Sequence, residues 1–214
     1  MKKFDPILYL VTDQDLSRGR PVEYIVEQAV KGGVTMVQLR EKECSTLDFV
    51  TRALRLKKML APRNIPLIIN DRLDVALASD ADGLHIGQDD MPYSLARKLL
   101  GKDKIIGLSV ENIEQAKEAN KLDVDYIGLS PVFVTGTKPE LLKALGLKGV
   151  RKIAGVSKHI MIAIGGINAQ NAADVLNAGA TGLAVVSAIS SADDPMKAAY
   201  EIRREIDKFK SKQK

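Results

Sequence analysis

Short apolar runs recur at regular intervals along this chain, and each is followed by a stretch whose apolar residues fall three and four positions apart. The apolar runs predict β-strands, and the spacing between them predicts helices. The predicted strands cover residues 7–13, 35–41, 66–71, 83–88, 104–110, 125–133, 159–166 and 182–189. Ser45, Asn112 and Asn168 each precede a helical stretch and are predicted N-caps.

The predicted strands are too apolar to leave one face in water, which indicates a parallel sheet covered by helices. Eight successive strand–helix units predict an α/β protein with a closed (β/α)₈ TIM barrel. An open doubly wound sheet is the alternative, but no G-x-G-x-x-G follows the first strand. We expect one domain over residues 1–214, with residues 208–214 as a flexible tail.

Composition and charge exclude several function classes. The hydrophobic fraction is 45%, the charged fraction is 28% and the net charge is only +5, which is typical of a globular protein. With no Trp and few aromatic residues, base stacking has little to use, so no nucleic-acid partner is expected. No apolar run approaches membrane-spanning length, and the apolar stretch near the N-terminus ends at Asp13 as a strand would, so neither a membrane partner nor a signal peptide is expected. The single cysteine, Cys44, fits a reducing compartment and predicts a cytoplasmic location.

Polar residues gather where the predicted strands end, which is where active sites lie in a barrel. The second strand ends in Gln38, Arg40 and Lys42, which alternation places on one face. An amide with two cations predicts a cradle for a polyanion. The alternative is that Arg40 and Lys42 are solvated loop charges.

Acidic residues follow the next two strands. Asn70 and Asp71 end the third strand, and Asp90 closely follows the fourth. Carboxylates from adjacent strand ends predict a site for a hard cation such as Mg²⁺. The alternative for each acid is an N-cap or a first-turn residue favoured by the helix dipole, and we assign Asp74 and Asp89 to that role.

The later strand ends offer groups that suit phosphate. Ser109 ends the fifth strand, and the loop after the sixth carries Thr135, Thr137 and Lys138, which suit an oxyanion or form an ordinary surface loop. Gly166 after the seventh strand and Val186–Ser187 after the eighth predict a phosphate site made by backbone N–H groups. His85 lies within a strand and is predicted to be a hydrogen-bonded core residue. Together these groups suit two phosphorylated ligands and the departure of pyrophosphate.

A set of motifs, in order along the chain, resembles thiamine-phosphate synthases: "LYLVTD", "QLREK", "INDRLDVA", "DGLHIGQDDMP", "GLSV", "YIGLSPVFVTGTK", "AIGGIN" and "VVSAI". The resemblance implies a (β/α)₈ barrel that joins hydroxymethylpyrimidine diphosphate to a thiazole phosphate, giving thiamine phosphate and pyrophosphate. It also implies a dissociative route, in which pyrophosphate leaves first and the thiazole nitrogen traps the pyrimidine cation. Such a nitrogen needs no general base.

The resemblance further implies roles for individual residues. Asp71 and Asp90 would hold Mg²⁺. The pyrimidine diphosphate would be bound by Gln38, Arg40, Lys42, Asn70, Ser109 and Lys138, of which Arg40, Ser109 and Lys138 would be catalytic. The thiazole phosphate would be bound by Thr135, Thr137, Gly166, Val186 and Ser187.

The chain departs from the usual family pattern at two positions on the thiazole side. Many members have Gly and Pro where this chain has Ser130 and Val134, and we expect Ser130 to crowd the end of the sixth strand. Three other functions stay open: a thiazole tautomerase of the same superfamily, a barrel that binds a phosphorylated ligand without turnover, and another phosphate-handling isomerase or aldolase. The sequence does not indicate the oligomeric state.

Overall fold

A closed barrel of eight parallel strands organises the computed structural model of the chain, which describes residues 4–134 and 144–212. Each strand pairs with the next one along the chain, and the last pairs with the first. The strands are β1 (Leu8–Val11), β2 (Met36–Leu39), β3 (Leu67–Asn70), β4 (Gly83–Ile86), β5 (Ile105–Val110), β6 (Tyr126–Leu129), β7 (Ile160–Ile164) and β8 (Gly182–Val185). The predicted (β/α)₈ barrel is confirmed.

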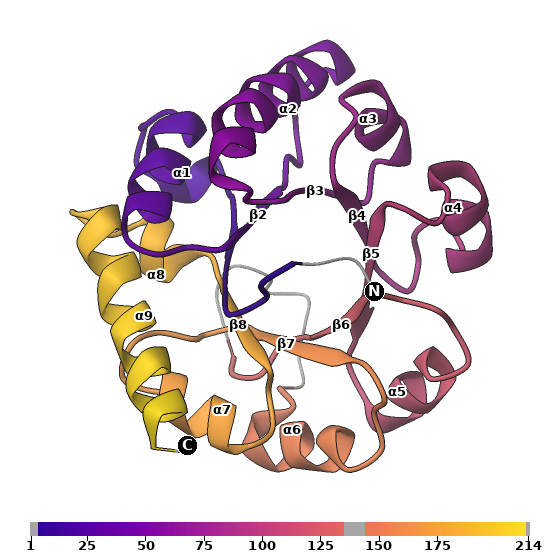
Figure 1. Cartoon of the computed structure of the whole chain (residues 1–214), viewed down its shortest axis with the longest axis vertical. Helices are drawn as coiled ribbons and strands as arrows, with labels where there is room; N and C mark the ends of the chain where they lie inside the picture. Colours follow the sequence, from indigo (N-terminus) through magenta and orange to yellow (C-terminus); the bar gives the residue numbers. More distant parts are fainter. Residues whose placement is uncertain (1–3, 135–143, 213–214) are drawn as a thin grey trace.

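Helices form a ring outside the strands, as Figure 1 shows in a view along the barrel. They are α1 (Val22–Lys31), α2 (Thr46–Leu60), α3 (Leu73–Ala78), α4 (Tyr93–Leu100), α5 (Ile113–Ala119), α6 (Gly146–Ala154), α7 (Ala172–Asn177), α8 (Ser187–Ser190) and α9 (Pro195–Ser211), with 3₁₀ turns η1 (Asp15–Ser17) and η2 (Ala61–Arg63). In the described parts of the chain, no helix has the length and apolar character needed to cross a membrane.

Alternation along each strand divides the core into two layers. Outward residues such as Leu8 and Leu10 of β1 are fully buried between strands and helices. Inward residues fill the barrel itself, and the buried hydrophobic ones are Tyr9, Val11, Met36, Ile68, Ile105, Tyr126, Ile162 and Ala184. Burial on both faces explains why the strands are near-continuous apolar runs.

Two of the three predicted helix caps are confirmed. The Ser45 side chain accepts a hydrogen bond from the Asp48 N–H, and that of Asn112 accepts one from the Gln115 N–H. The prediction for Asn168 is wrong, because its Oδ1 accepts from the N–H of Gln170 within a turn and α7 begins only at Ala172.

The C-terminal helix α9 packs beside α1 (Figure 1). A Cβ on Gly32, just after α1, would lie 2.3 Å from the carbonyl oxygen of Met196, so a glycine is needed for this close approach. Arg203 of α9 donates to the Gly33 carbonyl at 3.1 Å. The helix continues through residues 208–211 of the predicted tail, with Phe209 partly buried against the core.

Candidate active site

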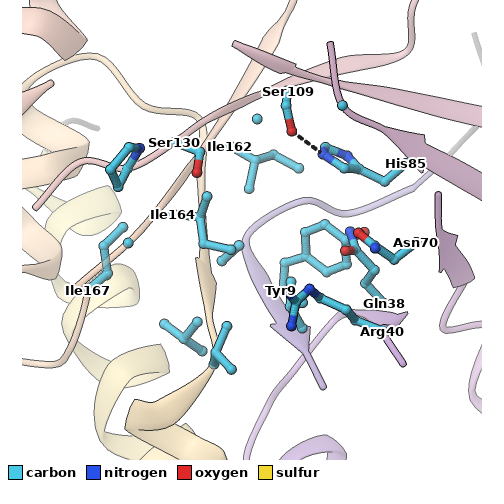
Figure 2. Close-up of a pocket in the computed structure, with 18 of the residues that line it drawn as sticks. Tyr9, Gln38, Arg40, Asn70, His85, Ser109, Ser130, Ile162, Ile164 and Ile167 are labelled. Carbon is cyan, nitrogen blue, oxygen red and sulfur yellow. Dashed lines mark hydrogen bonds between the residues drawn. The ribbon is translucent and has the colours of Figure 1, made fainter. Parts of the chain in front are cut away.

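A pocket lies at the carboxyl ends of the barrel strands (Figure 2). Its wall is built from the last residues of the strands and from the loops that follow them, as the barrel fold predicts. The predicted site residues that line it are Gln38, Arg40, Asn70, Asp71, Asp90, Ser109, Gly166, Val186 and Ser187.

The end of β2 supplies an amide and a guanidinium to this pocket. Gln38 is only 4% exposed, and its Nε2 donates to the Tyr9 hydroxyl at 2.8 Å. Arg40 is held at its backbone N–H, which donates to Thr12 Oγ1 at 3.0 Å, and at its Nη1, which lies 3.1 Å from Asp13 Oδ2. Lys42 is exposed and does not line the pocket, so its predicted role stays a prediction.

The two predicted metal ligands come from adjacent strand ends. Asp71 has a φ of 60°, a conformation that Asp tolerates better than most residues, and its N–H donates to the His85 carbonyl at 2.8 Å. Asn70 Nδ2 donates to Asp71 Oδ2 at 2.6 Å, and this contact orients the carboxylate. Asp90 Oδ2 accepts from the Gly87 N–H at 2.6 Å. A Cβ added to Gly87 would lie 2.9 Å from that oxygen, so a glycine leaves room for the carboxylate.

The donors on this side suit Mg²⁺. Both carboxylates line one pocket, next to an amide side chain that holds one of them. Within residues 4–134 and 144–212, no group of three or more His, Cys, Asp or Glu side chains is placed to enclose a metal ion. Two carboxylates with further coordination positions left to water and substrate phosphate match the usual coordination of Mg²⁺. Asp74, by contrast, is paired with Arg72, which lowers the pKa of Asp74.

The wall between these acids and β7 is formed by side chains that bond to one another. His85 Nε2 lies 3.0 Å from Ser109 Oγ, and His85 Nδ1 lies 3.0 Å from the Tyr126 hydroxyl. Figure 2 shows the imidazole ring of His85 directed at the Ser109 hydroxyl. Burial raises the pKa of Tyr9 and of Tyr126 well above the ordinary value of 10.0, so both phenols keep their protons at neutral pH.

Glycines after β7 let two loops approach each other closely. Gly165 and Gly166 have φ values of 107° and 66°, in the region that favours glycine. A Cβ on Gly166 would lie 2.9 Å from Cβ of Phe133, in the loop after β6. Asn171 Nδ2 donates to the Gly166 carbonyl at 2.9 Å and fixes the turn.

Apolar side chains line the same pocket, and in Figure 2 Ile162 and Ile164 lie between Ile167 and the side chains of Gln38 and Asn70. The apolar side chains include Ile162, Ile164, Ile167 and Ala184. A flat aromatic ring can lie against such a wall while charged groups are held at either end of the pocket.

Three predicted residues, Thr135, Thr137 and Lys138, lie outside the described part of the chain. Of the two positions that depart from the family pattern, Ser130 is 9% exposed and lines the pocket, and Val134 is 79% exposed.

Comparison with known proteins decides the family. The model of the family described as thiamine monophosphate synthase matches residues 8–189. The chain belongs to the thiamine monophosphate synthase family. The thiamine-phosphate synthase of Albidiferax ferrireducens is 52% identical over 94% of this chain and 91% of its own, and that of Chloroflexus aurantiacus is 50% identical over 92% and 90%. The solved structure of a thiamine phosphate pyrophosphorylase from Pyrococcus furiosus superimposes with a TM-score of 0.88, at 38% identity, covering 96% of this chain and 97% of that one.

Some pocket residues of this thiamine monophosphate synthase family member were not expected from its sequence. Tyr9 and Tyr126 line the pocket although they lie within strands, and His85 is hydrogen-bonded as predicted but is a wall residue of the pocket. The signal that could have identified them is alternation. Each faces inward two positions before another residue that lines the pocket: Tyr9 before Val11, His85 before Gly87 and Tyr126 before Gly128.

Proposed function

We propose that this protein is a thiamine-phosphate synthase, which joins hydroxymethylpyrimidine diphosphate to a thiazole phosphate and releases pyrophosphate. The observation that carries the proposal is the layout of one pocket. Carboxylates, amides and a guanidinium from β2 to β4 and the loops after them line this pocket, together with a glycine turn after β7 and apolar side chains. In Figure 2, Ile162 and Ile164 lie between Ile167 on one side and Gln38 and Asn70 on the other. That layout suits two anionic substrates whose rings meet in the middle. The names of the relatives support the same reaction.

The diphosphate end of the pyrimidine substrate would bind on the β2–β5 side. Arg40 is a nearly buried cation there, and Asn70 and Ser109 supply neutral hydrogen-bonding groups. Lys42 and Lys138 are proposed to add charge, and Gln38 to contact the pyrimidine. Guanidinium–phosphate bonds are strong and directional, so Arg40 can hold the leaving group as charge builds on it.

Asp71 and Asp90 are proposed to hold Mg²⁺. The metal would neutralise charge on the diphosphate oxygens and so make pyrophosphate a better leaving group. The hydrogen bonds from Asn70 and from the Gly87 N–H prepare the two carboxylates before any ligand arrives.

The thiazole phosphate would bind on the opposite side, at Gly166, Val186 and Ser187, together with Thr135 and Thr137. A phosphate site made by the loops after the seventh and eighth strands is common in this fold. The glycine turn keeps side chains out of the way at that point.

The reaction itself is proposed to be dissociative. Pyrophosphate leaves first, with Arg40, Ser109 and Lys138 holding its oxygens, and the thiazole nitrogen lone pair then attacks the pyrimidine methylene cation. The C–O bond breaks before the C–N bond forms, and no proton has to be removed from the attacking nitrogen. The apolar wall would hold the two rings together and limit the access of water to the cation.

The cytoplasmic location expected from the sequence also stays a prediction.

The test is direct. The purified protein is mixed with both substrates and Mg²⁺, and pyrophosphate and thiamine phosphate are measured together. Equal amounts of the two products support the synthase. Conversion of the thiazole alone to an isomer would indicate a tautomerase, and binding of both ligands without products would indicate a binding protein.

A further inference from the structure

Five side chains from five different strands form a continuous series of hydrogen bonds inside the barrel, which we call the interior chain. Gln38 Nε2 donates to the Tyr9 hydroxyl at 2.8 Å, and the Tyr9 and Tyr126 hydroxyls lie 3.0 Å apart. Tyr126 Oη lies 3.0 Å from His85 Nδ1, and His85 Nε2 lies 3.0 Å from Ser109 Oγ. This interior chain links two predicted substrate-binding residues, Gln38 and Ser109, that come from opposite sides of β3 and β4.

Packing holds the middle of the interior chain in place. Tyr9 is 2% exposed and Tyr126 is fully buried, and their rings meet edge to face with centroids 6.0 Å apart. The imidazole of His85 stacks on Tyr126 with centroids 5.5 Å apart and an interplanar angle of 25°. Phe4 contacts the Tyr126 ring at 6.0 Å between centroids. The hydroxyl of Tyr126 therefore has little freedom to change partners.

With Gln38 Nε2 toward Tyr9 and His85 neutral, the number of protons fixes the direction of these bonds. Each phenol keeps one proton, since burial raises the pKa of both. Tyr9 accepts from the Gln38 amide, so its own proton goes to Tyr126. The Tyr126 proton then goes to His85 Nδ1. A neutral imidazole has one N–H, so Nε2 carries it and donates to Ser109 Oγ.

We propose that Tyr126 is a positioning residue that acts through His85 to turn the hydroxyl proton of Ser109 into the pocket. Since Ser109 Oγ accepts from His85, its own proton has to point elsewhere, and the residue lines the pocket. The matching ligand group is a hydrogen-bond acceptor on the pyrimidine substrate, either a ring nitrogen or a diphosphate oxygen. This inference rests on the proposed function and adds that Ser109 donates a hydrogen bond to the pyrimidine substrate.

The direction of these hydrogen bonds predicts an NMR signature of His85 that can be measured without substrate. Nitrogen-15 NMR distinguishes a protonated imidazole nitrogen from an unprotonated one, and the chain has only two histidines. His159 Nε2 lies 2.8 Å from the Ala119 carbonyl, and a His159→Gln variant assigns its signals without touching the pocket. At mildly alkaline pH, His85 should carry its proton on Nε2 in the folded protein. Tyr126→Phe should shift the tautomer balance toward Nδ1–H.

A proton on Nδ1 in the unmodified protein would overturn the proposal. In that case the Gln38 carbonyl would accept from Tyr9, every bond would reverse, and Ser109 would offer the pocket only a lone pair. An unchanged tautomer in Tyr126→Phe would also overturn it. Because this readout requires no turnover, it is separate from any failure of the coupling assay, which would count against the synthase function instead.

A double-mutant cycle tests whether Tyr126 acts through Ser109. Tyr126→Phe keeps the ring, and its folding is checked by its thermal unfolding. We expect it to raise the KM for the pyrimidine diphosphate about tenfold, the equivalent of one hydrogen bond. The KM for the thiazole phosphate should stay unchanged. Adding Tyr126→Phe to Ser109→Ala should produce no further loss, whereas independent, additive losses would contradict action through Ser109.

Two ligands separate the possible acceptor atoms. Binding of pyrophosphate with Mg²⁺ reports on the diphosphate oxygens, and binding of the pyrimidine alcohol reports on the ring nitrogens. Ser109→Ala should weaken one of them about tenfold and leave the other near its original affinity. If neither ligand binds more weakly, Ser109 donates to no atom of the substrate and the proposal is wrong.

Discussion

The guanidinium of Arg40 and the carboxylate of Asp13 lie 3.1 Å apart at the rim of the pocket, and their side chains are 11% and 10% exposed. The carboxylate occupies one side of the guanidinium, which has five N–H donors in all. Asp13 therefore acts as a resident counter-ion that keeps a nearly buried cation in position until an anionic substrate binds.

Asp13→Asn should lower the free energy of unfolding by about 2 kcal/mol, because Arg40 loses its charged partner. Added pyrophosphate with Mg²⁺ should restore much of that loss by supplying a new anion. Thermal unfolding with and without the ligand measures both effects. Asp193→Asn is the matched control, since its pair with Arg18 is exposed and contributes little. An identical ligand-induced shift in Asp13→Asn and the parent protein would contradict this role.

Arg40→Ala should lower kcat/KM by about 100-fold while the protein stays folded, because the substrate diphosphate loses charged hydrogen bonds. Arg72→Ala provides the comparison. Arg72 bonds Asp74 and Thr46 and does not line this pocket. Initial rates at varied pyrimidine diphosphate measure the difference. A folded Arg40→Ala variant that binds the diphosphate normally would show that Arg40 does not hold the substrate.

Asp71→Asn and Asp90→Asn should each lower turnover by about 100-fold or more and raise the Mg²⁺ concentration needed for half-maximal rate. The amide keeps the size and one oxygen of each side chain, so the fold should persist. Asp89→Asn, next to one of these acids but exposed and outside the pocket, should behave like the parent protein. Normal Mg²⁺ dependence in both pocket variants would exclude them as metal ligands.

Gly166→Ala should lose activity out of proportion to its loss of stability. Its φ of 66° makes alanine strained by about 1 kcal/mol, and the new Cβ would press on Phe133 at 2.9 Å. Gly101→Ala also places an alanine at a positive φ, 76°, but has no atom within 4 Å of the added Cβ. Both variants should melt at lower temperature. Only Gly166→Ala should raise the KM for the thiazole phosphate, and equal KM values would place the ligand elsewhere.

Stability should fall at alkaline pH because of the two buried phenols. Burial raises the pKa of Tyr9 and Tyr126 above 10.0, whereas in the unfolded chain they ionise near that value. Above about pH 10 the unfolded state binds fewer protons than the folded state, so the free energy of unfolding falls by about 1.4 kcal/mol per pH unit for each phenol. Urea denaturation across this range measures the slope.

Tyr126→Phe should reduce that alkaline slope, since one of the two phenols is removed. Tyr200→Phe, at a side chain that is 58% exposed, should leave it unchanged. Equal slopes in all three proteins would mean that these phenols ionise alike in the folded and unfolded states.

The barrel and much of the pocket could be predicted because both follow from local pattern. Apolar runs fix the strands, and residues such as Asp71 and Ser109 stand where those runs end. Element boundaries were less accurate. The strand predicted over residues 125–133 ends at Leu129, because the chain leaves the sheet to form the loop that meets Gly165.

The interior chain could not be predicted, because a tyrosine or histidine inside a predicted strand is interpreted as an ordinary core residue. Tyr9 and Tyr126 are separated by 117 positions, and only closure of the ring brings their hydroxyls together. At Asn168 the sequence predicted a role, that of a helix cap, which the structure does not show. Asn168 is a good capping residue four positions before the helix begins at Ala172, but its side chain accepts from the Gln170 N–H in the preceding turn.

The pairing of β8 with β1 also has a consequence for biosynthesis. The seam is tight, since a Cβ on Gly182 would lie 1.8 Å from the Pro6 carbonyl oxygen, and the first strand has an unpaired edge until residues 182–185 are available. A nascent chain emerging N-terminus first therefore exposes that edge to other chains until β8 has been made. That edge is covered only when β8 pairs with β1, and the nearby packing of α9 against α1 forms later still.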